Sequence, residues 1–247
     1  MRRKNKIFGL VGRDISYSFS AGYFAKKFEK EGLDNHVYTN FDIDNIRQLP
    51  QILRDNKRLK GLNVTIPYKE EVIPLLDKLS KNAAIIGAVN TIKISKKGLK
   101  GYNTDHYGFR KALEPLLQPY HKKALILGTG GASKAVAFAL RRMKVEYDFV
   151  SRTATDVIFS YECLDEEVFN DYQIIINTTP LGTFPNIDEC PPINYELFTD
   201  KHIAFDLVYN PAETEFLKRA ALYGAAIKNG YEMLVHQAEK AWEIWNR

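Results

Sequence analysis

The feature that most constrains the fold is the segment KKALILGTGGASKAVAFALRRM, which covers residues 122–143. Its continuous apolar run predicts a buried strand, and the apolar residues at helical spacing after the glycines predict a long helix. Gly128, Gly130 and Gly131 permit a sharp turn and a close approach of the backbone to a ligand. A helix that begins there presents unpaired N–H groups and its positive dipole end to phosphate groups. The segment therefore predicts a dinucleotide-binding α/β unit, with a tight turn that binds nothing as the alternative.

The end of the next strand indicates which dinucleotide is bound. An NAD site usually carries Asp or Glu there, about 20 residues after the glycines, to bind the ribose 2′-OH. This chain has Ser151, Arg152 and Thr153 instead, with no carboxylate. A guanidinium with flanking hydroxyls is suited to a 2′-phosphate. We therefore expect NADP rather than NAD, and an ordinary solvated Arg152 is the alternative.

Two halves of the chain each alternate strands and helices. The first half predicts strands at 6–12, 36–43 and 61–66, helices at 20–33 and 45–56, another helix starting at Pro67, and a hairpin-like pair within 88–105. From Asp105 onward we expect a helix, then the strand, glycine-rich turn and long helix of 122–143, further strands at 146–152, 172–180 and 202–209, and helices at 213–223 and 230–247. Strands separated by helices of this length predict βαβ units and a mainly parallel sheet.

Lys69 stands out because the local structure gives no reason for it. Pro67 is a typical first residue of a helix, and Glu70 and Glu71 suit the first turn. A lysine in that turn faces the positive end of the helix dipole, which is unfavourable. We therefore expect Lys69 to serve a function in a cleft.

Polar residues gather at the ends of predicted strands in four segments, at 16–20, 63–69, 87–91 and 103–105. Ligands of open α/β sheets collect at the carboxyl ends of strands, so these segments are expected to converge. A lysine beside an aspartate, here Lys69 and Asp105, is a plausible proton-transfer pair. Serine and tyrosine hydroxyls bind a carboxylate, and Asn, Asp and Gln bind hydroxyls. The set predicts a site for a small polyol or hydroxy acid, although loop, turn or helix-capping roles explain each residue singly.

Composition and spacing exclude several other classes. The 35 basic and 30 acidic residues are spread along the chain with no nucleic-acid-binding module, so we expect no nucleic-acid partner. No apolar run reaches the roughly 20 residues needed to span a membrane. Cys163 and Cys190 form neither a disulfide framework nor a zinc pattern, which is typical of the cytoplasm. The five histidines lack metal-binding spacing, so we expect no metal.

Seven motifs occur in the order found in shikimate dehydrogenases, and the chain from about Gly9 to Ala238 resembles that family. The motifs are NVTIPYKE (63–70), GAVNT (87–91), NTD (103–105), GTGGAS (128–133), SRT (151–153), DLVYNP (206–211) and GYEMLVHQA (230–238). The resemblance implies reversible reduction of 3-dehydroshikimate to shikimate with NADPH, in aromatic amino acid and chorismate biosynthesis. It implies an α/β fold with a shikimate-binding domain (1–105 plus the helix 230–247) and a Rossmann-type NADP-binding domain (106–229). A monomer or a homodimer is expected.

The resemblance also implies a role for individual residues. Lys69 is the expected general acid/base, paired with Asp105. The substrate carboxylate is expected on Ser18 and Ser20 with Tyr209, and the other substrate oxygens on Thr65, Asn90 and Gln237. The cofactor is expected on Gly128, Thr129, Gly130, Gly131 and Ala132 at the pyrophosphate, on Ser151, Arg152 and Thr153 at the adenosine, and on Leu207 and Gly230 along the nicotinamide.

The chain departs from the family pattern at three places. Asp14, Tyr17 and Ala21 stand where the family usually has proline, histidine and proline around the serines, and His106 replaces a glycine. The stretch after Arg152 is short, so the helix that usually follows is expected to be reduced or lost with its basic residue. These departures leave two alternatives: a quinate/shikimate dehydrogenase that also uses NAD, and a non-catalytic protein that binds a metabolite or dinucleotide.

Overall fold

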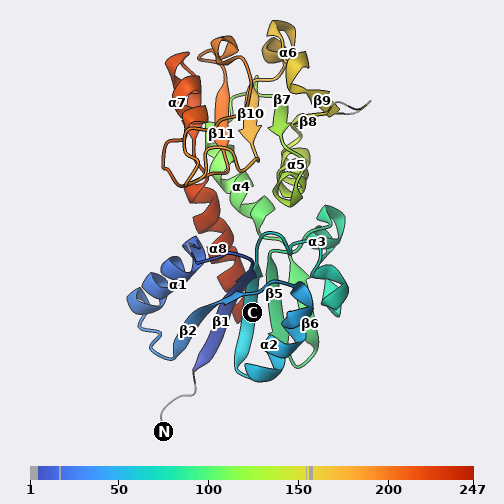
Figure 1. Ribbon diagram of the computed structural model, residues 1–247, viewed down its shortest axis with the longest axis vertical. Helices are drawn as coiled ribbons and strands as arrows, with labels where there is room; N and C mark the ends of the chain where they lie inside the picture. Colours follow the sequence, from blue (N-terminus) through green and yellow to red (C-terminus); the bar gives the residue numbers. More distant parts are fainter. Residues whose placement is uncertain (1–4, 17, 154, 156–157) are drawn as a thin grey trace. The chain divides into compact units, whose positions relative to one another are not determined.

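The computed structural model describes residues 5–16, 18–153, 155 and 158–247, and the chain divides into two compact units. The first unit runs to Thr104 and includes Ala238–Arg247, and the second is Asp105–Gln237. Each contains a six-stranded sheet with helices packed on it (Figure 1). The predicted α/β class with mainly parallel sheets is confirmed.

The first unit has the strand order β2-β1-β3-β5-β6-β4. Its strands β2, β1 and β3 are parallel, whereas β5 runs antiparallel to β3 and to β6. The end of β3 therefore lies beside the start of β5, where Asn63 pairs with Thr91. The elements are β1 (Lys6–Gly12), α1 (Phe19–Lys30), β2 (His36–Asp42), α2 (Leu49–Asp55), β3 (Leu59–Val64), β4 (Lys78–Leu79), α3 (Lys81–Ile86), β5 (Thr91–Ser95) and β6 (Gly98–Tyr102).

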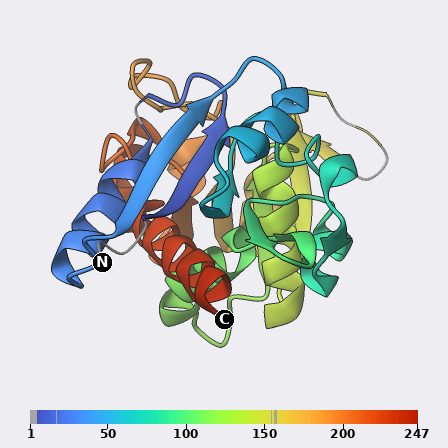
Figure 2. The ribbon, with the colours of Figure 1, turned by 90° about the horizontal axis from the view of Figure 1, so that it is seen from below.

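Aromatic side chains hold the two ends of the chain together within this unit. Helix α8 (Tyr231–Asn246) enters the unit at Ala238, and its last turns lie beside α1 (Figures 1 and 2). Phe24 and Phe8 contact Trp245 with ring centroids 5.4 and 5.1 Å apart. The Trp245 indole N–H also donates to the carbonyl of Ile92 on β5 at 3.0 Å. These contacts fix the C-terminal helix to the sheet.

The helix predicted to start at Pro67 is absent, so that prediction is wrong. Residues 66–72 form successive turns, and only a short 3₁₀ helix follows at Ile73–Leu75. Tyr68 explains this, because its ring is completely buried and its hydroxyl donates to the Ile43 carbonyl at 2.6 Å. Tertiary burial thus overrides the helix signal. Lys69 opposes no helix dipole, and the reason given above for its position does not hold.

The second unit has the strand order β12-β11-β10-β7-β8-β9, with every pair parallel. The predicted strands and helices are present, with strands trimmed by a few residues. The elements are α4 (Asp105–Leu113), β7 (Lys123–Leu127), α5 (Gly131–Met143), β8 (Glu146–Ser151), β9 (Ile158–Ser160), α6 (Glu166–Asp171), β10 (Ile174–Asn177), β11 (Ile203–Asp206), α7 (Glu215–Leu222) and β12 (Ala226–Lys228), followed by α8 as far as Gln237.

A short parallel edge strand follows Arg152 directly. Parallel neighbours are usually joined by a crossover of a dozen or more residues, commonly a helix. Here β9 begins at Ile158 and pairs with the last residues of β8, so that Ser160 lies opposite Ser151. The described residues between the two strands contain no helix. The expected loss of the helix after Arg152 is therefore seen in the described part of this connection.

A buried carboxylate joins three segments at the carboxyl ends of β10 and β11. Asp206 is fully buried and accepts hydrogen bonds from Asn177 Nδ2 (3.0 Å), the Val208 N–H (3.0 Å) and the Thr214 hydroxyl (2.6 Å). Burial raises the pKa of Asp206 to about 6, and the three donors only partly offset this. The carboxylate fixes the loop after β11 against the start of α7.

We expect Gly61→Ala to destabilise the first unit. An added Cβ would lie 2.3 Å from Trp245 Cδ1 and Nε1, so the indole that bonds Ile92 would have to shift. Such overpacking costs roughly 1–3 kcal/mol, measurable by urea unfolding followed through tryptophan fluorescence. Gly22→Ala is the matched control, since no atom lies within 4 Å of its added Cβ in α1. It should stabilise the protein by roughly 0.5–1 kcal/mol, and equal losses in both variants would contradict the packing argument.

The Asp206 carboxyl predicts a pH-dependent stability. Its folded pKa is raised, to about 6, so the stability due to the neutral form is present below its unfolded pKa and is lost as pH rises through about 6. Between pH 5 and pH 7.5 the loss should be about 1.4 kcal/mol, absent in Asp206→Asn. Urea unfolding of both proteins at the two pH values measures it. Asp188→Asn, which changes an exposed loop carboxylate, is the control and should keep the wild-type change in unfolding free energy between the two pH values. If Asp206→Asn also keeps that change, the explanation is wrong.

Candidate active site

The two predicted serines lie at the start of α1. Ser18 is the N-cap residue, and its Oγ accepts from the Ser20 N–H at 3.2 Å. Ser18 is half-buried, and Ser20 is 9% exposed within the first turn. Ser20 is therefore held mainly by tertiary contacts.

Tyr38 and Asn63 form a polar layer behind Ser20 that the sequence reasoning did not assign. The Tyr38 hydroxyl donates to Asn63 Oδ1 at 2.8 Å and bonds the Ser20 side chain. Burial raises the pKa of Tyr38 far above its usual value, so the phenol stays protonated. The sequence pattern of β2 does not mark Tyr38 as inward-facing, because the apolar Val37 beside it is exposed.

Asn90 is fixed by a buried network at the start of β5. Its Oδ1 accepts from the Thr104 N–H at 2.7 Å and from the Thr91 hydroxyl at 3.0 Å, while its Nδ2 donates to Thr104 Oγ1 at 2.9 Å. Asn63 Nδ2 donates to the Asn90 carbonyl at 3.2 Å, which connects this network to Tyr38. Ser20, Tyr38, Asn63, Asn90 and Thr104 thus form one continuous set, called the polar wall below. Buried polar groups satisfied in this way keep one geometry.

The loop that carries Lys69 runs along the same edge of the sheet. Thr65 donates its N–H to the Val11 carbonyl at 2.9 Å, and the Lys69 carbonyl accepts from Val89 at 2.7 Å. Lys69 itself is half-buried. Five predicted residues of the first unit (Ser18, Ser20, Thr65, Lys69 and Asn90) therefore share the edge formed by the ends of β1 and β3 and the start of β5.

Asp105 belongs to the second unit, immediately after Thr104. It is the first residue of α4 and only 6% exposed. His106, the next residue, packs edge-on against Phe138 of α5 with ring centroids 5.0 Å apart. This contact gives His106 a structural role in joining α4 to α5.

The departure at Asp14 changes the backbone before the serines. Asp14 adopts φ +54° and donates its N–H to Asp42 at 2.9 Å. Proline has φ near −65° and no N–H. The proline usual in the family could therefore neither adopt this positive φ nor donate a hydrogen bond to Asp42. Tyr17 lies outside the described residues, and Ala21 lies within α1.

The glycine turn after β7 has the form that a pyrophosphate requires. Gly128 has φ +104° with Thr178 Oγ1 2.9 Å from the position of an added Cβ, so only glycine is suited there. Gly130 caps α5 without a side-chain bond, and no atom lies within 4 Å of its added Cβ. Gly131 and Ala132 begin the helix, and Thr129 in the turn is exposed. Open space before uncapped helical N–H groups fits a dinucleotide pyrophosphate.

The adenosine end has an unpredicted neighbour, Tyr161. Arg152 and Thr153 are exposed just after β8, and Ser151 is half-buried at its end. The pairing of Val150 with Phe159 places both on the same core-facing side, and the next residues on that side are Arg152 and Tyr161. Burial raises the pKa of Tyr161, and the positive charge of Arg152 opposes this. The lost helix is thus replaced by a strand that brings a phenol near the guanidinium.

The predicted nicotinamide residues contact each other. An added Cβ on Gly230 would lie 2.1 Å from the Leu207 carbonyl oxygen, and the Gly230 N–H donates to Val208 at 3.0 Å. Tyr209 is half-buried in the loop anchored by Asp206. Gln237 is 6% exposed in α8, where its Nε2 donates to the Leu234 carbonyl. The second unit therefore presents Leu207 and Gly230 as one surface.

The described residues contain no group of three His, Cys, Asp or Glu side chains arranged to hold a metal ion. Their helices include none that is both long and apolar enough to cross a membrane.

Comparisons with known proteins agree with this geometry. A family model described as the shikimate dehydrogenase substrate binding domain matches residues 10–92. A shikimate dehydrogenase (NADP(+)) from Methanococcus aeolicus is 35% identical over 98% of this chain and 92% of the relative.

Solved structures extend the similarity to the whole fold. Shikimate 5-dehydrogenase from Thermus thermophilus, in complex with NADP(H) and shikimate, has a TM-score of 0.85 at 33% identity, covering 97% of this chain and 93% of that one. Quinate dehydrogenase from Corynebacterium glutamicum, in complex with NAD, has a TM-score of 0.85 at 28% identity, covering 98% and 94%. On the strength of its full-length relatives, the chain belongs to the shikimate dehydrogenase family.

Proposed function

We propose that this chain is a cytoplasmic shikimate dehydrogenase that reversibly reduces 3-dehydroshikimate to shikimate with NADPH. The observation that carries the proposal is the polar wall, which ends at Ser20 and Asn90 beside the Lys69 loop. A satisfied, buried hydrogen-bond network of this kind presents hydroxyl and amide groups in fixed directions, as recognition of a polyhydroxylated ring requires. Full-length similarity to shikimate dehydrogenases supports the same substrate.

The first unit supplies the groups for most of the substrate. Ser18 and Ser20 bind the carboxylate with Tyr209, and Thr65 and Asn90 bind hydroxyls together with Gln237. Asn90 Oδ1 accepts from Thr104 and Thr91 and its Nδ2 donates to Thr104, so the amide is held in one orientation at this edge.

Proton transfer is assigned to Lys69 with Asp105. When bound, NADP(H) supplies the hydride donor and acceptor for the reaction. As the ketone is reduced, Lys69 Nζ gives a proton to the oxygen that becomes the hydroxyl, and in the reverse direction it accepts that proton. Asp105 is proposed as the carboxylate paired with the lysine in this transfer.

The second unit supplies the residues for the dinucleotide. The turn from Gly128 to Ala132 holds the pyrophosphate, Ser151, Arg152 and Thr153 hold the 2′-phosphate and ribose, and Leu207 and Gly230 line the nicotinamide. The open space at Gly130 and the exposed guanidinium at Arg152 support NADP.

A quinate/shikimate dehydrogenase that also uses NAD is the second candidate. It is favoured by the connection after Arg152, where the described residues contain no helix and no second basic side chain. Rates with quinate and shikimate, each with NAD and NADP, separate the two. Ligand binding without turnover would instead favour the non-catalytic alternative.

Lys69→Ala should lower kcat by about two to four orders of magnitude, the usual contribution of a positioned general acid/base. Shikimate affinity should change little, because serines and amides provide most of the binding. Absorbance of reduced nicotinamide measures turnover, and calorimetry measures shikimate binding. Lys60→Ala, an exposed lysine on β3, is the control and should be fully active. Near-normal turnover of Lys69→Ala would refute the assigned role.

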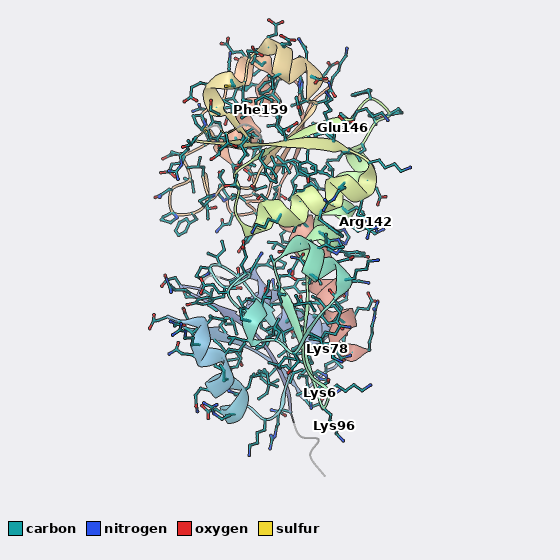
Figure 3. All side chains as sticks on the ribbon, turned by 90° about the vertical axis from the view of Figure 1, so that its right-hand side faces the viewer. Lys6, Lys78, Lys96, Arg142, Glu146 and Phe159 are labelled. Carbon is teal, nitrogen blue, oxygen red and sulfur yellow. The ribbon has the colours of Figure 1, made fainter. Side chains whose placement is uncertain are left out.

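Arg152→Ala should lower kcat/KM for NADP about 10- to 100-fold, because one charge-assisted bond to the 2′-phosphate is lost. The value for NAD should stay the same, since NAD has no such phosphate. Arg142→Ala is the control; its residue lies in the last turn of α5, away from the glycine turn (Figure 3). Parallel losses with both cofactors would mean that Arg152 supports the fold rather than the phosphate.

A further inference from the structure

A backbone feature before the serines is held by a side chain from the neighbouring strand. The N–H groups of Asp14 and Ile15 donate to the two carboxylate oxygens of Asp42, at 2.9 and 3.1 Å. Asn40 on the same strand donates its Nδ2 to the Ile15 carbonyl at 3.2 Å. The end of β2 therefore fixes both faces of the peptide at Ile15.

The conformation of Asp14 explains why the Asp42 carboxylate is suited to bind this turn. At φ +54° Asp14 is in the left-handed region, which aspartate tolerates better than most residues. A residue in this region lets successive N–H groups point to one side, where they form a concave site for an anion. Asp42 occupies that concavity, so the chain supplies its own anion to hold the turn.

The held turn leads directly to the serines. Ile15 is 4% exposed, and its carbonyl accepts from the Ser18 N–H at 3.1 Å. Ser18 in turn accepts from Ser20 as the cap of α1. The positions of both serine side chains thus follow from the position of Ile15.

The same turn is tied to the loop that carries Lys69. Arg13 donates its N–H to the Ile66 carbonyl at 3.2 Å, and its guanidinium lies 5.7 Å above the Tyr68 ring. The guanidinium also donates to the Asp44 carbonyl, while the Tyr68 hydroxyl donates to Ile43. The loops after β1, β2 and β3 therefore form one connected junction.

We propose that Asp42 is a positioning residue that holds the serine loop (residues 13–16 and 18–20) ready for the substrate carboxylate. This inference rests on the proposed function, in which Ser18 and Ser20 bind that carboxylate. In this proposal Asp42 acts through its hydrogen bonds to the turn at Asp14 and Ile15.

The test is Asp42→Asn, which replaces one acceptor oxygen with an NH₂ group facing a backbone N–H. KM for shikimate should rise about fivefold, comparable to the loss of a helix-capping carboxylate, with kcat within about twofold. KM for methyl shikimate, whose ester carries no charge, should stay the same. The ratio of the two KM values isolates carboxylate recognition from general damage to the fold.

Asp77→Asn is the matched control. Asp77 also accepts a backbone N–H, from Leu99 at 2.6 Å, but at the opposite edge of the same sheet, where β6 begins. This variant should lose similar stability and keep both KM values. An equal rise of the shikimate KM in both variants, or an equal rise for acid and ester in Asp42→Asn, would overturn the proposal.

Two substitutions at Asp14 test the backbone rather than the side chain. Asp14→Gly keeps the N–H and accepts a positive φ, so its shikimate KM should match the wild type. Asp14→Pro removes the N–H and excludes that φ, so it should reproduce the Asp42→Asn effect or exceed it. A wild-type KM in Asp14→Pro would also overturn the proposal.

Amide exchange tests the anchor without any substrate. The Asp14 and Ile15 amides should exchange about fivefold faster in Asp42→Asn than in wild type and Asp77→Asn. Unchanged exchange would overturn the proposal even if shikimate is the substrate. Faster exchange in a protein that does not turn over shikimate would support the anchor and refute the proposed function, so the two failures are distinguishable.

Discussion

The site in the first unit depends on buried hydrogen bonds at the end of β3. Asn63 stands between two groups, since it accepts from Tyr38 and donates towards Asn90 and Thr91. Asn63, Asn90 and Thr91 are each less than 5% exposed, so an unmade bond there would carry the full cost of desolvation. The network therefore has one favourable arrangement, and that arrangement determines where the Ser20 and Asn90 side chains point. Recognition at this edge is a consequence of satisfying buried polar groups.

Strand direction determines which loops can contribute residues to the proposed site. Since β1, β2 and β3 are parallel, their carboxyl ends lie at one edge, and β5 starts there because it runs antiparallel to β3. The second unit repeats this logic with its glycine turn, Arg152 and Leu207 after β7, β8 and β11. Asp206 has the same role in the second unit as Asn63 has in the first. Each is a buried polar side chain that hydrogen-bonds segments following different strands.

The sequence predicted what depends on local pattern and failed where tertiary contacts decide. The glycine turn, the α/β class and most elements follow from periodicity and turn chemistry, and the structure contains them. The helix at Pro67 does not form, since burial of the Tyr68 ring determines that loop. Tyr38, Asp42 and Tyr161 were missed for a related reason: each matters through a partner far along the chain, and a single sequence does not show such pairings. Lys69 was singled out for a reason that the structure removes, and its assignment now rests on its motif and loop.

Two departures of this chain from its family replace a local constraint near the proposed binding groups, while the third, His106, directly follows Asp105. At the serine loop, a turn with positive φ held by Asp42 takes the place of a proline-containing turn. At the adenosine end, a strand followed directly by Tyr161 takes the place of a helix. Both changes exchange a local constraint, set by one residue or one helix, for a contact between neighbouring strands. Both contacts involve outer strands, since β2 and β9 lie at the margins of their sheets. Under the proposed function, the groups for the carboxylate and for the 2′-phosphate can therefore vary separately from Lys69 and Asp105, whose proton transfer requires a fixed geometry.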